Sequence, residues 1–136
     1  MSNEATISSA LRIQKGNLNY QSAPTSFRAD VTGTKGPTPG AVTALVAGTD
    51  VDLTALSTPG LCRIKNLDAS NYVTYGIGDG GFFYPLGELL AGESYVLRLS
   101  RVLGSISPGT AGTGQTTLRL VADTAECVVA VEAFEL

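Results

Sequence analysis

Short runs of apolar and β-branched residues recur along the chain between clusters of Gly, Pro, Asn and Asp, and helical periodicity is nearly absent. Within residues 26–32 apolar and charged side chains alternate. This period of two is typical of a strand with one solvent-exposed face. The pattern predicts an all-β protein of about eight strands. We expect strands at residues 7–14, 26–32, 41–47, 61–66, 72–77, 94–100, 116–122 and 127–135, with weaker pieces at 51–53 and 82–85.

The breaks between these runs are also informative. Two stretches rich in Gly and Pro, residues 33–40 and 104–115, predict loops. Pro85 restricts its segment to an edge strand or a strand end, because proline cannot donate to a sheet ladder. Residues 87–93 are the only stretch in which we expect a helical turn. The last strand, 127–135, is apolar on both faces for most of its length, so we expect it to be central or covered.

Short strands without crossover helices predict a two-sheet antiparallel sandwich, jelly-roll-like, with an immunoglobulin-like sandwich as the alternative. An immunoglobulin core favours a buried Trp, and the chain has none. A length of 136 residues fits one domain. We therefore expect a single sandwich over residues 1–136, with a short flexible N-terminal arm at about residues 1–6.

Composition narrows the range of partners. Charged residues make up only 15% of the chain, so either the surface is rich in Ser, Thr and Gly or a partner covers part of it. The nine basic residues are scattered and the net charge is −3, which argues against a nucleic-acid partner. No apolar run approaches the roughly 20 residues of a membrane span. The first residues lack the order of a secretory signal, so we expect a chain made in the cytosol.

The side chains that usually perform chemistry are missing or dispersed. The chain has no histidine, which removes the usual general base and the commonest metal ligand. The twelve carboxylates are spread over turns and strand ends, and none forms a recognisable pair. Residues 76–81, GIGDGG, lack the helix that follows a phosphate-binding loop, and a β-turn is the favoured interpretation. We expect no enzyme, no cofactor and no metal site.

The only two cysteines, Cys62 and Cys127, each lie within an apolar strand pattern. This placement favours buried free thiols, with a disulfide between neighbouring strands as the minority alternative.

One cluster of residues is a candidate for function. Five of the nine aromatic residues fall within thirteen positions, and on strands they cannot all enter one core. Ordinary packing with an exposed tyrosine and an interface or ligand platform both remain open. The candidate interface residues are Tyr72, Tyr75, Phe82, Phe83 and Tyr84.

Residues 67–76 (LDASNYVTYG), 83–94 (FYPLGELLAGES) and 97–99 (LRL) resemble a pattern in small β-sandwich proteins of tailed bacteriophages, which decorate heads or form parts of tails. The resemblance covers residues 66–99 and brings no catalytic residues with it. It implies a head decoration or cement protein, often a trimer, that binds the major capsid protein on the outer surface of the virion. Such a protein is assembled in the host cytoplasm.

Two functions therefore remain in view. The first is a virion structural protein that stabilises the capsid by bridging subunits. The alternative is a receptor- or carbohydrate-binding module of a phage tail or fibre, with the aromatic cluster as a stacking platform. Neither needs a nucleic acid or a membrane.

Overall fold

The computed structural model describes residues 3–100, 103 and 116–136. Over this part of the chain the protein is all-β, with twelve strands and no helix. No helix capable of crossing a membrane occurs among the described residues. The chain divides into two compact units, residues 1–32 and residues 33–136.

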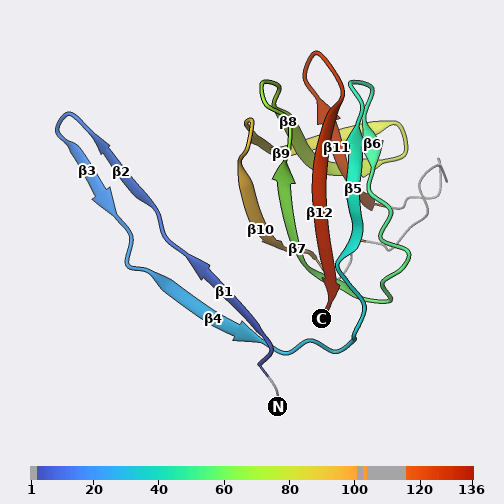
Figure 1. The fold of residues 1–136 in the computed structure, drawn as a ribbon, viewed down its shortest axis with the longest axis horizontal. Coiled ribbons are helices and arrows are strands. Elements are labelled where there is room, and N and C mark those ends of the chain that lie inside the picture. The colour runs from blue at the N-terminus through green and yellow to red at the C-terminus, as the bar shows by residue number, and fades with distance from the viewer. Residues whose placement is uncertain (1–2, 101–102, 104–115) are drawn as a thin grey trace. The chain divides into compact units, whose positions relative to one another are not determined.

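The first unit is a two-stranded antiparallel ribbon made of two successive strand pairs (Figure 1). Strands β2 and β3 pair next to the turn, and strands β1 and β4 pair at the open end of the ribbon. Gly16 and Asn17 form the two-residue turn, and Gly16 takes the positive φ of 55° that suits glycine. The ladder is interrupted near Pro24, which has no N–H to donate. The strands are β1 (Ala5–Ser9), β2 (Arg12–Lys15), β3 (Leu18–Gln21) and β4 (Thr25–Ala29).

The second unit is a sandwich of two four-stranded antiparallel sheets (Figure 1). One sheet has the order β10-β7-β12-β5 and the other the order β6-β11-β8-β9. Every connection except the one from β8 to β9 changes sheet, and this arrangement is the jelly roll. The strands are β5 (Thr38–Ala44), β6 (Thr49–Asp50), β7 (Pro59–Asn66), β8 (Val73–Asp79), β9 (Phe82–Leu89), β10 (Ser94–Arg98), β11 (Thr116–Ala122) and β12 (Cys127–Glu135).

The core of the jelly roll lies between the two sheets and follows the period of two along their strands. On β12 every odd position from 127 to 135 is buried, and the even positions face outward or are half-buried. Leucine, isoleucine and valine fill most of this space, and the largest fully buried apolar side chains are Leu53, Leu56, Ile64, Leu89, Leu120, Val51, Val73, Val129 and Val131. The core therefore belongs to residues 33–136 alone.

The structure confirms the predicted all-β sandwich and its jelly-roll order. It also confirms that the last strand is central, since β12 pairs with both β5 and β7. Pro85 lies on β9, an edge strand, as expected. Both cysteines are buried free thiols, and burial raises the pKa of the Cys62 thiol to about 12, with a smaller contribution from the Glu132 carboxylate.

Three expectations differ from the structure. Residues 1–32 form a compact unit of their own, whereas we expected one domain with an arm of about six residues. The expected loop 33–40 ends early because β5 begins at Thr38, and Pro39 is tolerated there since β5 is an edge strand. The expected helical turn at 87–93 is instead the end of β9 followed by a tight turn, in which Gly92 has a φ of 79°. The predicted loop at 104–115 lies outside the described residues.

Candidate interaction surfaces

The ribbon has no core. None of the described residues 3–32 is buried, although several carry large apolar side chains. Leu18 is 58% exposed and Tyr20 is 52% exposed, directly beside the turn. Two paired strands leave both of their faces open, so these side chains have nothing within the ribbon to cover them. The exposed large apolar residues of the ribbon are Leu11, Ile13, Leu18, Tyr20 and Phe27.

The strands of the ribbon carry charges of one sign, and the two carboxylates of this unit, Glu4 and Asp30, lie outside the strands at its base. Residues 5–29 contain Arg12, Lys15 and Arg28 and no acidic residue, whereas residues 33–136 contain six basic and ten acidic residues. Arg63 forms an ion pair with Glu132, and Arg119 forms one with Asp50. Neither pair involves a cation of the ribbon. The ribbon is therefore an apolar and basic element in a chain that is acidic as a whole.

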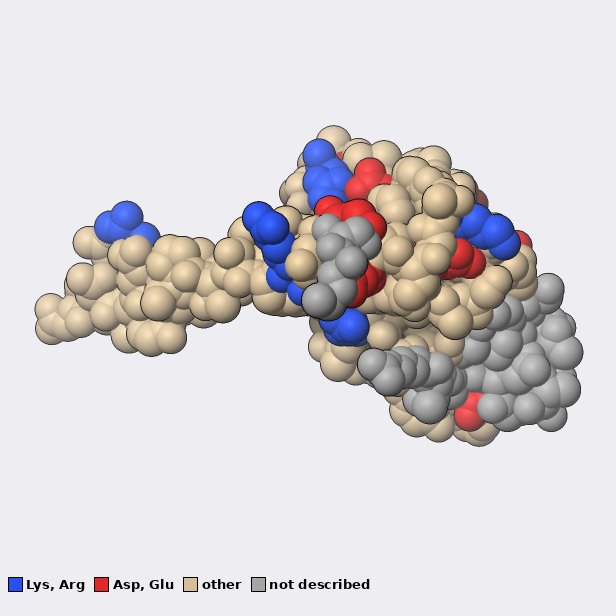
Figure 2. Space-filling view, turned by 90° about the horizontal axis from the view of Figure 1, so that it is seen from below, with Lys and Arg blue, Asp and Glu red and all other residues tan. Residues whose placement is uncertain are grey.

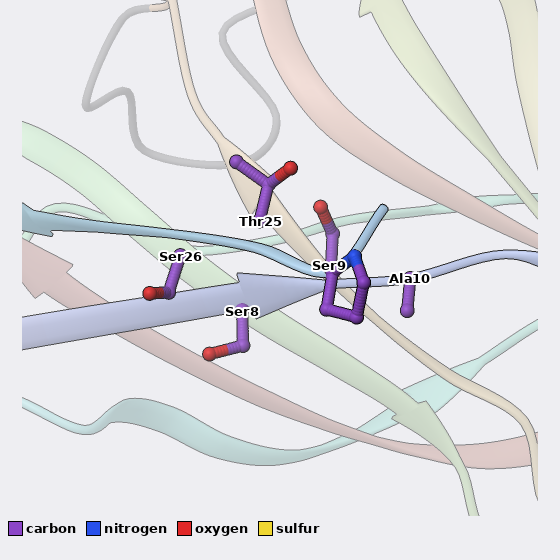
Figure 3. A pocket seen from close by; sticks show the side chains of 6 residues that line it. Ser8, Ser9, Ala10, Thr25 and Ser26 are labelled. Carbon is purple, nitrogen blue, oxygen red and sulfur yellow. The ribbon is translucent and has the colours of Figure 1, made fainter. Parts of the chain in front are cut away.

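A hollow lies at the bend of the ribbon, where β1 ends and β4 begins (Figure 3). Its wall consists of hydroxyl-bearing and small residues, without a charged side chain. The hydroxyls can donate and accept hydrogen bonds, but they have no neighbouring base to activate them. The residues that line it are Ser8, Ser9, Ala10, Pro24, Thr25 and Ser26.

The five aromatic residues predicted as an interface do not form one platform. Tyr72 precedes β8, whereas Phe82 begins β9 beyond the far end of β8. The ring of Tyr75 lies over Gly87 and packs against the core, and Phe83 is half-buried. Only Phe82 and Tyr84 remain strongly exposed on one strand, at 69% and 57%. Leu86 on the same strand is also exposed, at the register shift in the pairing of β9 with β8.

An ionic network fixes the β8–β9 hairpin. The guanidinium of Arg119 on β11 donates to the Asp50 carboxylate on β6, with Nε 2.5 Å from Oδ1. It also donates to the carbonyl oxygens of Gly80 at 2.8 Å and Phe82 at 2.9 Å, on both sides of the β8–β9 turn. Thr117 donates to the same carboxylate at 3.1 Å. One side chain thus ties β6, β11 and the β8–β9 turn together.

This network predicts a pH dependence of stability. The hydrogen bond from Arg119 lowers the pKa of Asp50 below its ordinary value, against the opposing effect of burial. Because the folded-state pKa is the lower one, the stabilisation is complete above the unfolded-state pKa and is lost as pH falls through the folded-state value. Asp50→Asn should therefore lower the free energy of unfolding at pH 7 by about 1–3 kcal/mol. It should also flatten the fall in stability below about pH 4.

Urea unfolding of the wild type and the variant at several pH values between 2 and 7 measures both effects. Arg119→Met is the matched variant, because it removes the other partner of the same pair. It should weaken the acid dependence that Asp50 contributes. If the free energy of unfolding fell with pH in both variants as it does in the wild type, the Asp50–Arg119 pair would not be the source of this pH dependence.

Four loops gather at one end of the jelly roll, and we call this surface the four-loop end. It consists of residues 45–48, 67–72, 90–93 and 123–126, which connect β5 to β6, β7 to β8, β9 to β10 and β11 to β12. Backbone hydrogen bonds join the loops to their neighbours: Ala122 N to Leu45 O, Asp123 N to Tyr72 O, and Asn66 N to Glu93 O.

The buried side chain of Asn66, at the end of β7, holds the 67–72 loop in place. Its side-chain amide donates to the carbonyl oxygens of Asn71 at 2.8 Å and Leu89 at 3.2 Å, and its Oδ1 accepts from the backbone N–H of Asp68 at 2.9 Å. The Asp68 carboxylate in turn accepts from the N–H groups of Ser70 and Asn71. These bonds hold the 67–72 loop in one shape without covering its outer surface.

The outer surface of the four-loop end is apolar and acidic. The loops hold four carboxylates, Asp68, Glu93, Asp123 and Glu126, and no basic residue. The effect of this charge is visible on Tyr72, whose pKa is raised first by the Asp123 carboxylate and further by Glu88. The exposed large apolar residues of the same loops are Leu45, Val46, Leu67, Tyr72 and Leu90.

A small apolar groove opens between the two sheets, where Tyr75 and Leu86 face Leu97 and Leu118. It brings together no pair of carboxylates. No group of three or more potential metal ligands occurs among the described residues. The described lining of this groove is mainly apolar.

Comparison with protein-family models, with curated proteins and with solved structures found no match.

Sequence reasoning missed the ribbon and the four-loop end. The ribbon had a local signal, because Gly16-Asn17 separates two short alternating runs and such dipeptides are typical of hairpin turns. The four-loop end had none. Its loops come together only through the strand order of the two sheets.

Proposed function

We propose that the protein is a virion structural protein of a tailed bacteriophage, a decoration or cement protein of the outer capsid surface. The observation that carries this proposal is the ribbon, in which no described residue is buried. Ordering a residue costs about 1–2 kcal/mol, and an isolated two-stranded ribbon buries too little surface to offset that cost. A partner surface that covers the ribbon removes the difficulty, so the ribbon is an element for assembly.

The jelly roll is compatible with this role without specifying it. The same architecture serves viral capsid proteins and lectins, and a fold by itself does not establish a function. A surface with few charges supports the role more directly, because wide contacts then require little desolvation of charge. Most of the surface visible in Figure 2 is neither basic nor acidic. Several weak contacts made together by a homo-oligomer, with a trimer favoured, give firm attachment to the major capsid protein.

The test uses capsids of the encoding virus assembled without this chain. Adding the purified protein should coat the outer surface and raise the melting temperature of the capsids. A variant with Leu11→Ser, Ile13→Ser and Leu18→Ser should bind at least about tenfold more weakly, because it loses apolar contact area on assembly. Its own melting temperature should remain unchanged, since these side chains are exposed.

The matched control replaces exposed apolar residues of the jelly roll, Phe82→Ser with Tyr84→Ser. This control should bind capsids as the wild type does. Failure of the wild type to bind them, or equal binding by the ribbon variant, would count against the proposal.

The exposed aromatic side chains on β9 favour a second candidate, a receptor- or carbohydrate-binding module of a tail or fibre. Exposed aromatic rings such as Phe82 and Tyr84 provide flat apolar faces for a sugar ring. In that case host cells or glycans should retain the wild-type protein, and Tyr84→Ala should reduce the retention. Binding to capsids with no binding to cells decides for the first candidate.

A further inference from the structure

We infer that the ribbon of one copy docks onto the four-loop end of a second copy of this chain. This inference goes beyond the proposed function, because it concerns contacts between copies and holds whether or not they lie on a capsid. It rests on two surfaces of the same protein that are both exposed, both apolar and opposite in charge.

The first surface is the ribbon near its turn. Ile13 and Tyr20 are cross-strand partners, as are Lys15 and Leu18. All four side chains are exposed, so apolar area and positive charge lie within the same few residues. Arg12 adds a second cation on β2. A surface that accepts this region must cover the apolar area and supply carboxylates, since an unpaired buried cation is costly.

The second surface meets both requirements. The four-loop end presents five exposed large apolar residues together with four carboxylates and no cation. Asp68 and Glu93 accept hydrogen bonds from backbone N–H groups within their own loops, which keeps them fixed at the surface. Glu126 is exposed, and no described residue forms a hydrogen bond or an ion pair with its carboxylate. A fixed acidic and apolar surface loses little conformational entropy when it binds.

Opposite charge selects between possible occupants of the four-loop end. Two copies meeting through their four-loop ends would bring like charges together, and two ribbons would do the same. A ribbon on a four-loop end is the combination of these two surfaces in which apolar area and charge both match. The two surfaces in this contact are different parts of the chain. One copy can therefore bind a neighbour through its ribbon and bind another neighbour through its four-loop end.

Sedimentation of the purified full-length protein tests the inference. The wild type should self-associate, and raising the salt concentration from about 0.05 M to 0.5 M should weaken the association, since salt screens exposed charges. Reversing the ribbon charges with Arg12→Glu and Lys15→Glu should weaken self-association at least about tenfold. The loop variant with Asp123→Lys, Ala125→Lys and Glu126→Lys places three lysines against the two remaining carboxylates, Asp68 and Glu93, and should weaken self-association by the same amount. Lys35→Glu with Arg98→Glu, two reversals elsewhere, should leave it unchanged.

Mixing the two reversed proteins is the decisive step. Each has like charges on its two surfaces and should be dissociated alone, whereas the mixture again offers opposite charges and should associate. This recovery also shows that both variants are folded. A wild type that sediments as a monomer at every concentration, or a mixture that associates no better than its components, overturns the inference. Because no capsid is present, either result is independent of the test of the proposed function.

Discussion

Gly76→Ala is expected to lower the free energy of unfolding by about 3 kcal/mol or more, and the melting temperature by about 10 °C or more. Gly76 lies on β8 at a register shift in the pairing with β9, where Tyr75 faces Gly87 and Gly76 faces Pro85. A methyl group at this position would meet the carbonyl oxygen of Tyr84 and would lie 2.9 Å from the Cα of Pro85.

The expected loss is large because the obstacle is backbone. Both opposing atoms belong to the main chain of β9, so no side chain can rotate away and the two strands must separate. That separation would break the ladder between β8 and β9 and displace the exposed side chains of Phe82 and Tyr84. Thermal and urea unfolding followed by circular dichroism measure the effect.

Gly81→Ala in the turn of the same hairpin is the matched control. A Cβ at Gly81 meets nothing within 4 Å, and its backbone is not in the positive-φ region. This variant should unfold within about 0.5 kcal/mol of the wild type. Equal stability of the Gly76 and Gly81 variants would contradict the close approach of the two strands.

Much of the jelly roll could be predicted from local pattern. The alternation of apolar and polar residues predicted strands, and the apolar character of residues 127–135 predicted a central or covered strand, which β12 is. Pro85 predicted an edge strand or a strand end, and β9 is an edge strand, where a missing N–H leaves no neighbour without a donor. These features depend only on a few neighbouring residues, so they can be predicted from the sequence.

Features that depend on distant parts of the chain were not predictable in the same way. Residues 7–14 and 26–32 have strand patterns, but a pattern does not say whether a strand joins the sandwich or pairs only with its neighbour. Likewise the five aromatic residues are close in sequence, yet β8 separates Tyr72 from Phe82 by the length of a strand. The end of β9 resembled a helical turn because Leu89 and Leu90 are good helix formers, and the pairing of β9 with β8 overrode that local preference.

The two units should differ in what stabilises them. Residues 33–136 bury a common core, so their strands should open only when the whole sandwich unfolds. The ribbon has cross-strand pairs and hydrogen bonds at its base, such as Asn3 N to the Asp30 carboxylate at 2.8 Å, but no core. Its order should therefore depend on the surface that covers it, and assembly should stabilise it far more than it stabilises the jelly roll.

Hydrogen exchange measured by mass spectrometry tests this claim most directly, on the protein at a concentration low enough for a monomer and again in its assembled form. In the monomer the amides of β2 and β3 should exchange within about a hundredfold of an unstructured peptide, while those of β12 are slowed by about 10⁴-fold or more. In the assembly the exchange of the ribbon should slow by at least a further hundredfold, with β12 little changed. Ribbon amides protected in the monomer as strongly as those of β12 would contradict the account.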